Sequence, residues 1–432
     1  MSTFNRASED GIARGERALL VLPDRSGDAN SRSLDARLDE AAGLAAAIGI
    51  AVVARKAFRI RQPRPATLFG KGQVEEIASL AEEHEAGLLI VDAALTPVQQ
   101  KSLEEEAKTK VIDRTGLILE IFGERAATAE GRLQVELAHL DYQAGRLVRS
   151  WTHLERQRGG FGFLGGPGET QIEADRRLIR DRMAKIRREL EQVTRTRGLH
   201  RDRRQRAPWP VIALVGYTNA GKSTLFNLMT RAEVFAENLL FATLDPTMRE
   251  VKIPGFDKAI LSDTVGFVSN LPTQLVAAFR ATLEEVSSAD LILHVRDIAH
   301  PDSDAQKEDV ETVLASLGLD EEGAPPRMEV WNKIDLLEGD DREALLNESG
   351  RRDDVIPISA ADGTGVDELR QEIALRLRGD AAVHHVRLAA AEGNKLAWLH
   401  SKGEVLDSRV EGECIDLDVR LSQENWTRFQ SL

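Results

Sequence analysis

The sequence lacks several features that mark particular classes of protein. Its single cysteine, Cys414, cannot form a disulfide within the chain, and a chain without disulfides is typical of a reducing compartment. No cysteine and histidine residues are grouped with the spacing of a zinc site. The most apolar run, residues 41–54, is shorter than the roughly 20 residues that span a bilayer, and two glycines interrupt it. We therefore expect neither a zinc protein nor a membrane-spanning one, and we interpret the run as a helix, a turn and a strand.

The 432 residues are too many for one ordinary hydrophobic core, so several domains are expected. No apolar stretch follows a basic start at the N-terminus. This indicates that residues 1–16 form a disordered tail rather than a secretory signal. Together these features predict a cytoplasmic protein.

Charge is distributed unevenly along the chain. The net charge of −14 would by itself discourage binding to nucleic acid, because that binding depends on the neutralisation of phosphates. Residues 176–206, however, contain thirteen Lys and Arg residues and four acidic ones. This segment is a basic region in an otherwise acidic protein.

The first part of the chain alternates between two kinds of segment. Strand-like pieces such as "RALLVL" and "GLLIVD" are separated by helix-like pieces such as "QVEEIASLAEEH" over residues 17–112. This alternation predicts a small α/β domain with a mainly parallel sheet, which we assign to residues 17–128. The glycine-rich "FGKG" at residues 69–72 lacks the rest of a phosphate-binding signature, so we interpret it as a turn before a helix.

From residue 129 onward the apolar spacing becomes that of long helices. Two series of apolar residues repeat at alternating steps of four and three, and each series predicts one apolar stripe on a helix. The segment between them, residues 158–169, is glycine-rich, and Thr170 with Glu173 is typical of a capping box that starts the second helix. We therefore expect an antiparallel helical hairpin over residues 129–207. The two series are Leu133, Leu137, Leu140, Ala144, Leu147, Trp151 and Leu154, and Ile179, Met183, Ile186, Leu190 and Val193.

The tip of this hairpin admits two interpretations. A glycine-rich loop can be a simple flexible connector. A connector, however, has no reason to expose large apolar side chains, whereas aromatic residues beside an arginine-rich helix suit stacking on unpaired RNA bases. The residues expected to contact RNA are Phe161, Phe163, Leu164, Arg176, Arg177 and Arg180.

Residues 211–229, "VIALVGYTNAGKSTLFNLM", consist of an apolar strand, a glycine loop and a helix. This is the context that a phosphate-binding loop requires. Gly216 and Gly221 allow the backbone N–H groups to point inward at the phosphates, at a helix N-terminus that favours negative charge. Lys222 is expected to bridge the β- and γ-phosphates, and the Ser223 hydroxyl to bind Mg²⁺.

Two further segments have the order and spacing of nucleotide switches. In "FATLDPT", residues 241–247, the spacing allows either Thr243 or Thr247 to offer a hydroxyl to Mg²⁺, and an ordinary turn is the simpler alternative. In "DTVGFV", residues 263–268, Asp263 can hold a Mg²⁺-bound water, and the Gly266 N–H can touch the γ-phosphate.

Two more segments indicate that the base is guanine. In "VWNKID", residues 330–335, Asp335 would accept the two guanine hydrogens at N1 and N2, which adenine lacks. Asn332 is expected to meet the purine edge and Lys333 to cover the ring. "ISAADG", residues 358–363, would complete the base pocket through backbone groups near Ser359 and Ala360. A general ATPase that remodels RNA is the alternative, and Asp335 argues against it.

Having these motifs in this order, the chain resembles the HflX family of ribosome-associated GTPases. The resemblance depends on the nucleotide motifs and on two family-specific segments, "RAATAEGRLQVELAHLDYQAGRL" and "GGPGETQIEADRR". It implies that Thr243, rather than Thr247, is the Mg²⁺ threonine. It further implies a GTPase that binds the large ribosomal subunit and its rRNA in the GTP form, with splitting of ribosomes or rescue of stalled ones as its role, and association with ribosomes or peripherally with a membrane. A ribosome-assembly factor is the alternative role, and we expect a monomer.

The predicted site extends over all of these motifs. The expected Mg²⁺ ligands are Ser223 and Thr243, with Asp263 acting through water. The residues expected to bind GTP are Gly216, Tyr217, Thr218, Asn219, Ala220, Gly221, Lys222, Ser223, Phe241, Ala242, Thr243, Leu244, Asp245, Asp263, Thr264, Val265, Gly266, Asn332, Lys333, Ile334, Asp335, Ser359, Ala360 and Ala361.

Phe267 stands where a water-orienting glutamine would be useful to a GTPase. A phenylalanine can neither orient water nor stabilise the charge that develops during phosphoryl transfer. The side chain either packs under the switch, away from the nucleotide, or takes part directly. Both interpretations predict slow intrinsic hydrolysis, and we assign no residue as general base.

The remaining sequence completes the expected architecture. We assign residues 208–379 to the GTP-binding domain and residues 380–432 to a small α+β domain, because a hairpin pattern surrounds Glu411 and Gly412. The adjacent His384 and His385 would face opposite sides of a strand and are poor metal ligands. The fold class is therefore α/β: a phosphate-loop GTPase domain, preceded by a small α/β domain with a long helical hairpin and followed by an α+β domain.

Overall fold

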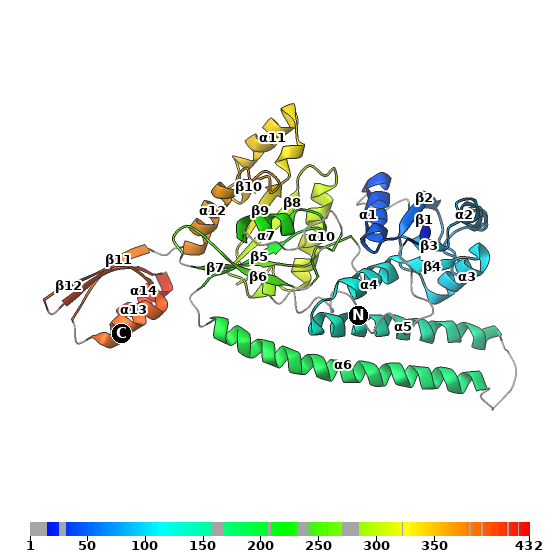
Figure 1. The fold of residues 1–432 in the computed structure, drawn as a ribbon, viewed down its shortest axis with the longest axis horizontal. Helices are drawn as coiled ribbons and strands as arrows, with labels where there is room; N and C mark the ends of the chain where they lie inside the picture. The colour runs from blue at the N-terminus through cyan, green and yellow to red at the C-terminus, as the bar shows by residue number, and fades with distance from the viewer. Residues whose placement is uncertain are drawn as a thin grey trace.

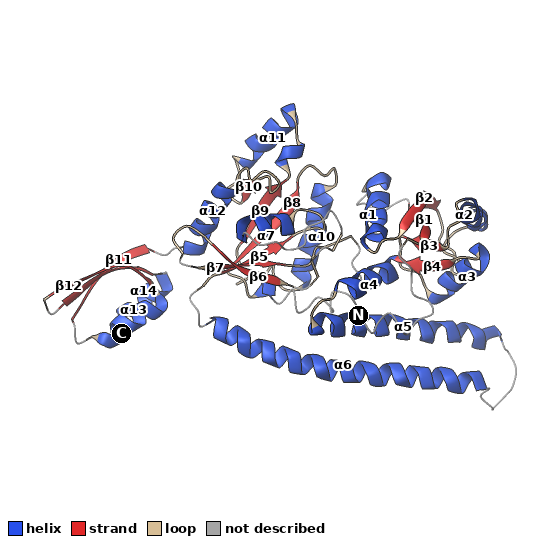
Figure 2. Ribbon diagram, viewed as in Figure 1, coloured by secondary structure: helices blue, strands red, loops and turns tan. Residues whose placement is uncertain are grey.

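Three domains, each with its own sheet, follow one another along the chain in the computed structural model, and two long helices lie beside the first two domains (Figures 1 and 2). The structure describes residues 15–25, 32–157, 167–205, 209–230, 240–241, 243–244, 246–256, 258–269, 285–321, 323–379, 382–389, 392–412, 414–421 and 423–432.

The N-terminal domain is a parallel four-stranded sheet of order β2-β1-β3-β4 with helices on both faces. This confirms the predicted α/β unit. Its strands are β1 (Arg17–Arg25), β2 (Ala51–Ile60), β3 (Leu88–Val91) and β4 (Lys110–Asp113). Its helices are α1 (Leu34–Ala47), α2 (Lys71–Glu83), α3 (Pro97–Ala107) and α4 (Arg114–Arg125).

Strand β1 shows why its run of apolar residues forms the centre of the sheet. Successive side chains on a strand point to opposite faces. Leu20 and Leu22 enter the cluster that contains α1 and α4, whereas Leu19 and Val21 enter the cluster that contains α2 and α3. Both faces are therefore covered, as a parallel sheet requires. The "FGKG" segment is the predicted turn, because Gly70 is the N-cap residue of α2.

The predicted hairpin consists of α5 (Ala129–Gln157) and α6 (Pro167–Gln205), which lie side by side in Figure 1. The Nε and Nη2 atoms of Arg182 on α6 donate to the two carboxylate oxygens of Glu136 on α5, at 2.6 and 2.8 Å. Met183 and Ile186 of the predicted stripe are buried. The prediction that Thr170 starts the second helix is wrong, because α6 already begins at Pro167, and proline suits a first helical position where its missing N–H costs nothing.

Helix α5 packs on two sides, whereas the spacing predicted a single apolar stripe. The predicted residues Leu133, Leu137 and Leu140 are only partly buried, whereas Val135 and Ala138 are buried in the core of the N-terminal domain. The stripe prediction considered only the partner helix. The second side attaches the hairpin firmly to the N-terminal domain.

The middle domain is a six-stranded sheet of order β10-β9-β8-β5-β7-β6, in which only β6 is antiparallel to its neighbour among the described strands. Its strands are β5 (Val211–Val215), β6 (Thr247–Val251), β7 (Ala259–Asp263), β8 (Leu291–Asp297), β9 (Arg327–Asn332) and β10 (Val355–Pro357). Its described helices include α7 (Lys222–Thr230), α10 (Ser303–Ser316), the 3-10 helix η2 (Ile334–Leu336), α11 (Gly339–Ser349) and α12 (Val366–Arg378).

One hydrophobic cluster crosses from the N-terminal domain into the middle domain. It joins Phe122 of α4 to Tyr217, Phe241 and Phe267, which belong to the predicted nucleotide motifs. The rings of Phe122 and Phe241 meet edge to face, with centroids 4.8 Å apart. The two domains therefore contact each other through the predicted nucleotide-binding segments.

The C-terminal domain is an antiparallel three-stranded sheet of order β11-β13-β12 with two helices on one face, which is the predicted α+β unit. His384 stacks on Trp426 with ring centroids 3.8 Å apart, while His385 pairs with Asp418 at 2.9 Å. The elements are β11 (Ala382–Ala389), α13 (Gly393–Lys402), β12 (Glu404–Glu411), β13 (Cys414–Leu421) and α14 (Gln423–Gln430). No helix in the described part of the chain is long and apolar enough to cross a membrane.

Candidate functional site

The predicted phosphate loop connects the end of β5 to the start of α7. Gly221 has φ +92°, and a Cβ atom there would lie 2.1 Å from the Asn332 amide nitrogen. Only glycine fits this position. The first turn of α7 follows directly, so its unpaired N–H groups lie next to the loop, where they favour an anion.

Lys222 is buried beneath this loop. Its ammonium group donates hydrogen bonds to the carbonyls of Gly216 at 3.0 Å and Tyr217 at 2.8 Å. Burial lowers the pKa of Lys222 to about 8, although the charge of Asp263 opposes the shift. A bound phosphate would favour the charged form further, so the site is prepared for a strongly negative ligand.

Three oxygen-bearing side chains from separate segments meet beside Lys222. The hydroxyls of Ser223 and Thr243 donate to the same oxygen of Asp263, at 2.8 and 2.9 Å, and lie 3.0 Å from each other. The other carboxylate oxygen of Asp263 is buried and has no hydrogen-bond partner among the described residues. Burial raises the pKa of Asp263, against the opposing charge of Lys222.

This donor set fits a magnesium ion. Mg²⁺ prefers oxygen ligands, keeps several waters and takes few protein groups together with substrate phosphates. Two hydroxyls and a carboxylate with an unused oxygen offer that chemistry. The described residues contain no cluster of three or more His, Cys, Asp or Glu that could hold a metal, so a magnesium ion here would depend on the nucleotide for further ligands.

Gly266 lies close to the phosphate loop. A Cβ atom on it would be 2.7 Å from a methyl carbon of Thr218 and 3.1 Å from the Lys222 ammonium nitrogen. A side chain there would enter the space where phosphates are expected. Glycine therefore leaves this space open, and the contact of the Gly266 N–H with a γ-phosphate stays a prediction.

Phe267 is buried in the cluster shared by the two domains, at 2% exposure. Its backbone pairs with the phosphate loop, because Thr218 N–H donates to the Phe267 carbonyl at 2.7 Å and Phe267 N–H donates to the Gly216 carbonyl at 3.2 Å. Of the two interpretations of this residue, the structure agrees with packing under the switch.

The predicted base-binding residues come from the ends of β9 and β10. Asn332 is buried, and its amide donates to the Ala220 carbonyl at 2.8 Å and accepts from the Ala360 N–H at 2.9 Å. Asn332 thereby ties the phosphate loop to the "ISAADG" loop. Asp335 is exposed, where a base could reach it. The predicted contact of Asn332 with the purine edge stays a prediction.

Lys333 is held by a residue that the sequence did not single out. It has φ +69°, and its ammonium group donates to Asp297, at the end of β8, at 2.7 Å. Ser359 is fully buried and its hydroxyl accepts from the Asp362 N–H at 3.3 Å. The predicted residues Ala242 and Asp245 lie outside the described residues, as do Phe161, Phe163 and Leu164 of the hairpin tip.

Sequence reasoning missed the residues of the N-terminal domain that reach the site. Arg32, Glu40 and Arg114 form hydrogen bonds with Tyr217 and Ser269, across separations of 155 residues or more. No local pattern signals such contacts. Tyr217 was predicted only as one member of the loop.

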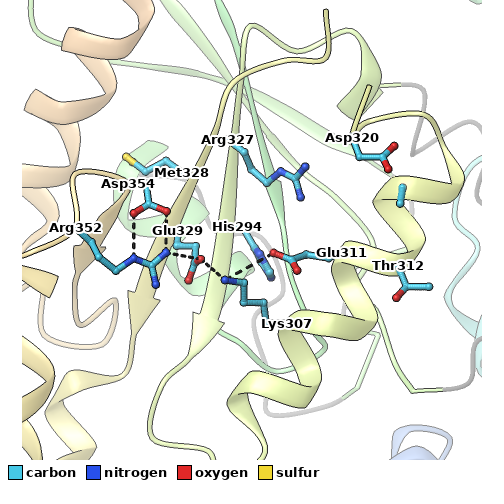
Figure 3. Close-up of a pocket in the computed structure, with 11 residues that line it drawn as sticks. His294, Lys307, Glu311, Thr312, Asp320, Arg327, Met328, Glu329, Arg352 and Asp354 are labelled. Carbon is cyan, nitrogen blue, oxygen red and sulfur yellow. Dashed lines mark hydrogen bonds and ion pairs between the residues drawn. The ribbon is translucent and has the colours of Figure 1, made fainter. Parts of the chain in front are cut away.

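A separate pocket lies toward the amino-terminal halves of β8, β9 and β10, away from the strand ends that carry the nucleotide motifs (Figure 3). Its volume is about 610 Å³. Glu329 accepts from Lys307 at 2.6 Å and from Arg352 at 3.0 Å, and Arg352 also pairs with Asp354. Burial lowers the pKa of His294 in this pocket to about 3, so the imidazole is neutral. Lys307 and Arg352 are thus already paired with acidic side chains, and Arg327 donates to the Leu319 carbonyl at 3.1 Å.

Comparisons with known proteins agree with this geometry. Family models described as GTP-binding GTPase N-terminal, GTP-binding GTPase Middle Region, 50S ribosome-binding GTPase and HflX C-terminal domain match residues 35–123, 125–204, 211–333 and 344–430. The chain is 52% identical over 376 residues to a GTPase HflX of Magnetococcus marinus, covering 87% of this chain and 85% of that protein. It is 42% identical over 421 residues to a GTPase HflX of Escherichia coli, covering 97% of each.

Among solved structures, a GTP-binding protein from the archaeon Sulfolobus solfataricus in complex with GDP matches with a TM-score of 0.45 and 24% identity, over 84% of this chain and 98% of that one. This chain covers 85% and 97% of the length of these two HflX relatives, and residues of the phosphate loop and of both switch segments meet in the structure. The chain is therefore a GTP-hydrolysing enzyme with a phosphate-loop domain, and it belongs to the HflX family of GTPases.

Proposed function

We propose that this GTPase binds the large ribosomal subunit in its GTP form, that the subunit stimulates its slow hydrolysis, and that the cycle splits or rescues stalled ribosomes. One observation carries the proposal: the switch segments pack against the domain that holds the basic hairpin. Phe241 and Phe267 share a cluster with the N-terminal domain, in which Val135 and Ala138 of α5 are also buried. A rearrangement of the switches therefore acts by direct contact on the N-terminal domain. The basic hairpin of α5 and α6, called the arm below, is attached to that domain.

Each part of the site has a role in this proposal. The phosphate loop and Lys222 hold the β- and γ-phosphates. Ser223 and Thr243 bind Mg²⁺ directly, and Asp263 binds it through water. When bound, Mg²⁺ neutralises charge on the β- and γ-phosphates. Asp335 accepts the two guanine hydrogens, and the Gly266 N–H registers the γ-phosphate.

Slow hydrolysis follows from the position of Phe267. Phosphoryl transfer needs a positioned water and stabilisation of the developing charge. The Phe267 side chain faces the core and supplies neither, and we assign no general base among the described residues. The activating element then comes from the ribosome, so the protein remains GTP-bound until it has docked.

The arm supplies the contact with ribosomal RNA. Arg177 and Arg180 are exposed on α6, and Arg176 lies beside them, half-buried. Arginine side chains neutralise phosphates, while the apolar residues of the tip, Phe161, Phe163 and Leu164, would stack on unpaired bases. The protein acts as a cytoplasmic monomer in this proposal.

The decisive experiment measures GTP hydrolysis with and without purified large ribosomal subunits at physiological salt, together with co-sedimentation in GTP, GDP and a non-hydrolysable analogue. We expect stimulation by the subunits and retention only with GTP or the analogue. An unchanged hydrolysis rate would refute the proposal.

A matched pair of variants tests the arm. Arg177→Gln with Arg180→Gln removes two charges from α6, whereas Arg342→Gln with Arg351→Gln removes two exposed charges in and just after α11. Only the first pair should weaken co-sedimentation and reduce its salt dependence. Equal behaviour of both pairs would remove the RNA assignment.

A further inference from the structure

The hydroxyl of Tyr217 is the point where the phosphate loop, switch II and the N-terminal domain meet. Switch II here means residues 263–269. The Tyr217 hydroxyl donates to Glu40 at 2.5 Å, and it accepts from Arg32 at 2.8 Å and from the Ser269 N–H at 2.6 Å. A phenol has one hydrogen to donate and two lone pairs. Every hydrogen-bonding position of this hydroxyl is therefore used.

The groups from the N-terminal domain are themselves tightly held. Glu40 accepts from Arg114 and from the Ser269 hydroxyl on one oxygen, and from Arg32 and Tyr217 on the other. Arg114 also donates to the Ser269 carbonyl at 3.0 Å. The side chains of Arg32 and Glu40 are 10% and 12% exposed. Hydrogen bonds to charged groups in such a setting are stronger than those between neutral groups.

This network binds switch II at Ser269, just after Gly266, the residue proposed to sense the γ-phosphate. Ser269 lies three residues beyond Gly266. Residues 267–269 run along the phosphate loop through three hydrogen bonds, two made by the Phe267 backbone and the third by the Ser269 N–H to Tyr217. The third depends on a side chain, and that side chain is bound to the N-terminal domain.

We propose that Tyr217 is a positioning residue for GTP hydrolysis: through its hydroxyl, Glu40 and Arg32 of the N-terminal domain hold the backbone of switch II in a restrained arrangement. In this arrangement the Phe267 side chain faces the core, and its carbonyl accepts a hydrogen bond from the Thr218 N–H of the phosphate loop. Bringing water and an activating group to the γ-phosphate requires switch II to leave it. The inference rests on the proposed function, and it deepens the account of why intrinsic hydrolysis is slow.

The substitution Tyr217→Phe removes one oxygen atom and keeps the ring. The Ser269 N–H then loses its acceptor. Arg32 and Glu40 each lose one hydrogen bond. The restrained arrangement becomes less populated relative to arrangements in which switch II is free. Intrinsic kcat without ribosomes should rise by roughly three- to thirtyfold, whereas KM for GTP should change little.

The chain contains a matched control. Tyr142, the other of its two tyrosines, has a half-buried hydroxyl that also bonds to a carboxylate and an arginine, since it donates to Asp113 at 2.6 Å and accepts from Arg146. It does not bond to switch II. Tyr142→Phe should leave the intrinsic kcat unchanged, although it removes the same chemical group.

The experiment uses the full-length protein and two measurements: single-turnover GTP hydrolysis without ribosomes, and hydrogen–deuterium exchange of the peptide containing Ser269 in the nucleotide-free protein. In Tyr217→Phe both should accelerate, and in Tyr142→Phe neither should. If hydrolysis in Tyr217→Phe is equal to or slower than in the wild type, or both variants behave alike, the proposal is overturned.

Glu40→Gln is a second variant, which removes charge without removing volume and lies outside the nucleotide-binding segments. It should raise kcat in the same direction, by a smaller factor, and an unchanged kcat would count against the proposal even if Tyr217→Phe failed to fold. Because these measurements use no ribosomes, a wild type that ribosomes fail to stimulate would refute the proposed function alone. An unresponsive Tyr217→Phe in a protein that ribosomes do stimulate would refute this inference alone.

Discussion

The N-terminal and GTP-binding domains each place a buried aspartate at the end of a strand, but the two carboxylates differ in their hydrogen-bond partners. Asp113 ends β4 and Asp263 ends β7, each of these strands has a parallel neighbour, and both residues are at most 1% exposed. Asp113 accepts four hydrogen bonds, two on each oxygen. Asp263 accepts two hydroxyls on one oxygen, and its other oxygen has no partner among the described residues.

The difference teaches how a carboxylate that stabilises a fold differs from one that waits for a ligand. A buried charge is tolerated when all of its lone pairs are satisfied. The partners of Asp113 are the backbone of Leu95 and Gly116 and the side chains of Tyr142 and Arg146. It thus caps α4 and anchors α5. Asp263 keeps one oxygen that has no hydrogen-bond partner in the described part of the chain, and a cation or water can complete it.

The largest effect is expected at Lys222. Lys222→Ala removes the buried ammonium group beneath the phosphate loop, and nucleotide affinity should fall by at least about 100-fold, or about 3 kcal/mol. The fold should remain intact, because relief from the desolvation of the buried charge offsets the loss of its two hydrogen bonds. Fluorescent GDP titration and circular dichroism would check both. Normal affinity would contradict the assignment of the phosphate loop.

The second effect is a loss of stability at Asp113. In Asp113→Asn an amide NH₂ replaces one carboxylate oxygen, so the two groups that donate to that oxygen lose their acceptor and a donor is buried against donors. The free energy of unfolding should fall by about 2–3 kcal/mol, and GDP affinity should stay within about twofold of wild type. Denaturant unfolding and GDP titration measure the two. A loss of GDP affinity without a loss of stability would contradict the claim that Asp113 stabilises the fold and takes no part in nucleotide binding.

The smallest effect is expected from the same substitution at Asp263. Because the pKa of Asp263 is raised by burial, the folded protein binds a proton more tightly than the unfolded chain does. Wild-type stability without nucleotide or Mg²⁺ should therefore decrease as the pH rises from the ordinary aspartate pKa through the raised one. Asp263→Asn does not titrate, and at pH 7 it should be more stable than the wild type.

Thermal unfolding of both proteins in EDTA between pH 4 and pH 7 would test this. The two stabilities should converge toward the acidic end, since protonated aspartic acid resembles asparagine. A variant that is less stable than the wild type at pH 7 would show that Asp263 is satisfied in the empty site, which would contradict its contrast with Asp113.

Local pattern was sufficient for much of the fold and for the motifs. The α/β alternation of the first domain, the helical hairpin and the small α+β domain were predicted from apolar spacing and turn residues, because these depend on neighbours within a few residues. The strand and helix around Lys222 and Ser223 identified the phosphate loop for the same reason. The start of α6 was wrong by three residues, because Pro167 and the capping box at Thr170 are competing local signals.

Other features depended on partners distant in the chain. The spacing of α5 could show one stripe but not the second, with Val135 and Ala138, which exists only because the N-terminal domain lies against that side. The same is true of Asn332, whose amide links two loops instead of standing free in the pocket.

By itself the sequence determined that this protein has a guanine-nucleotide motif set, a hydrophobic residue at position 267 and a basic helical arm, since each of these is written in consecutive or regularly spaced residues. Only the tertiary structure decided where Phe267 points, and that Glu40 and Arg32 reach the phosphate-loop hydroxyl of Tyr217 across 177 and 185 positions of the chain. The physical reason is that hydrogen bonds and apolar contacts act over a few ångströms of space, and packing brings together groups that no sequence interval relates.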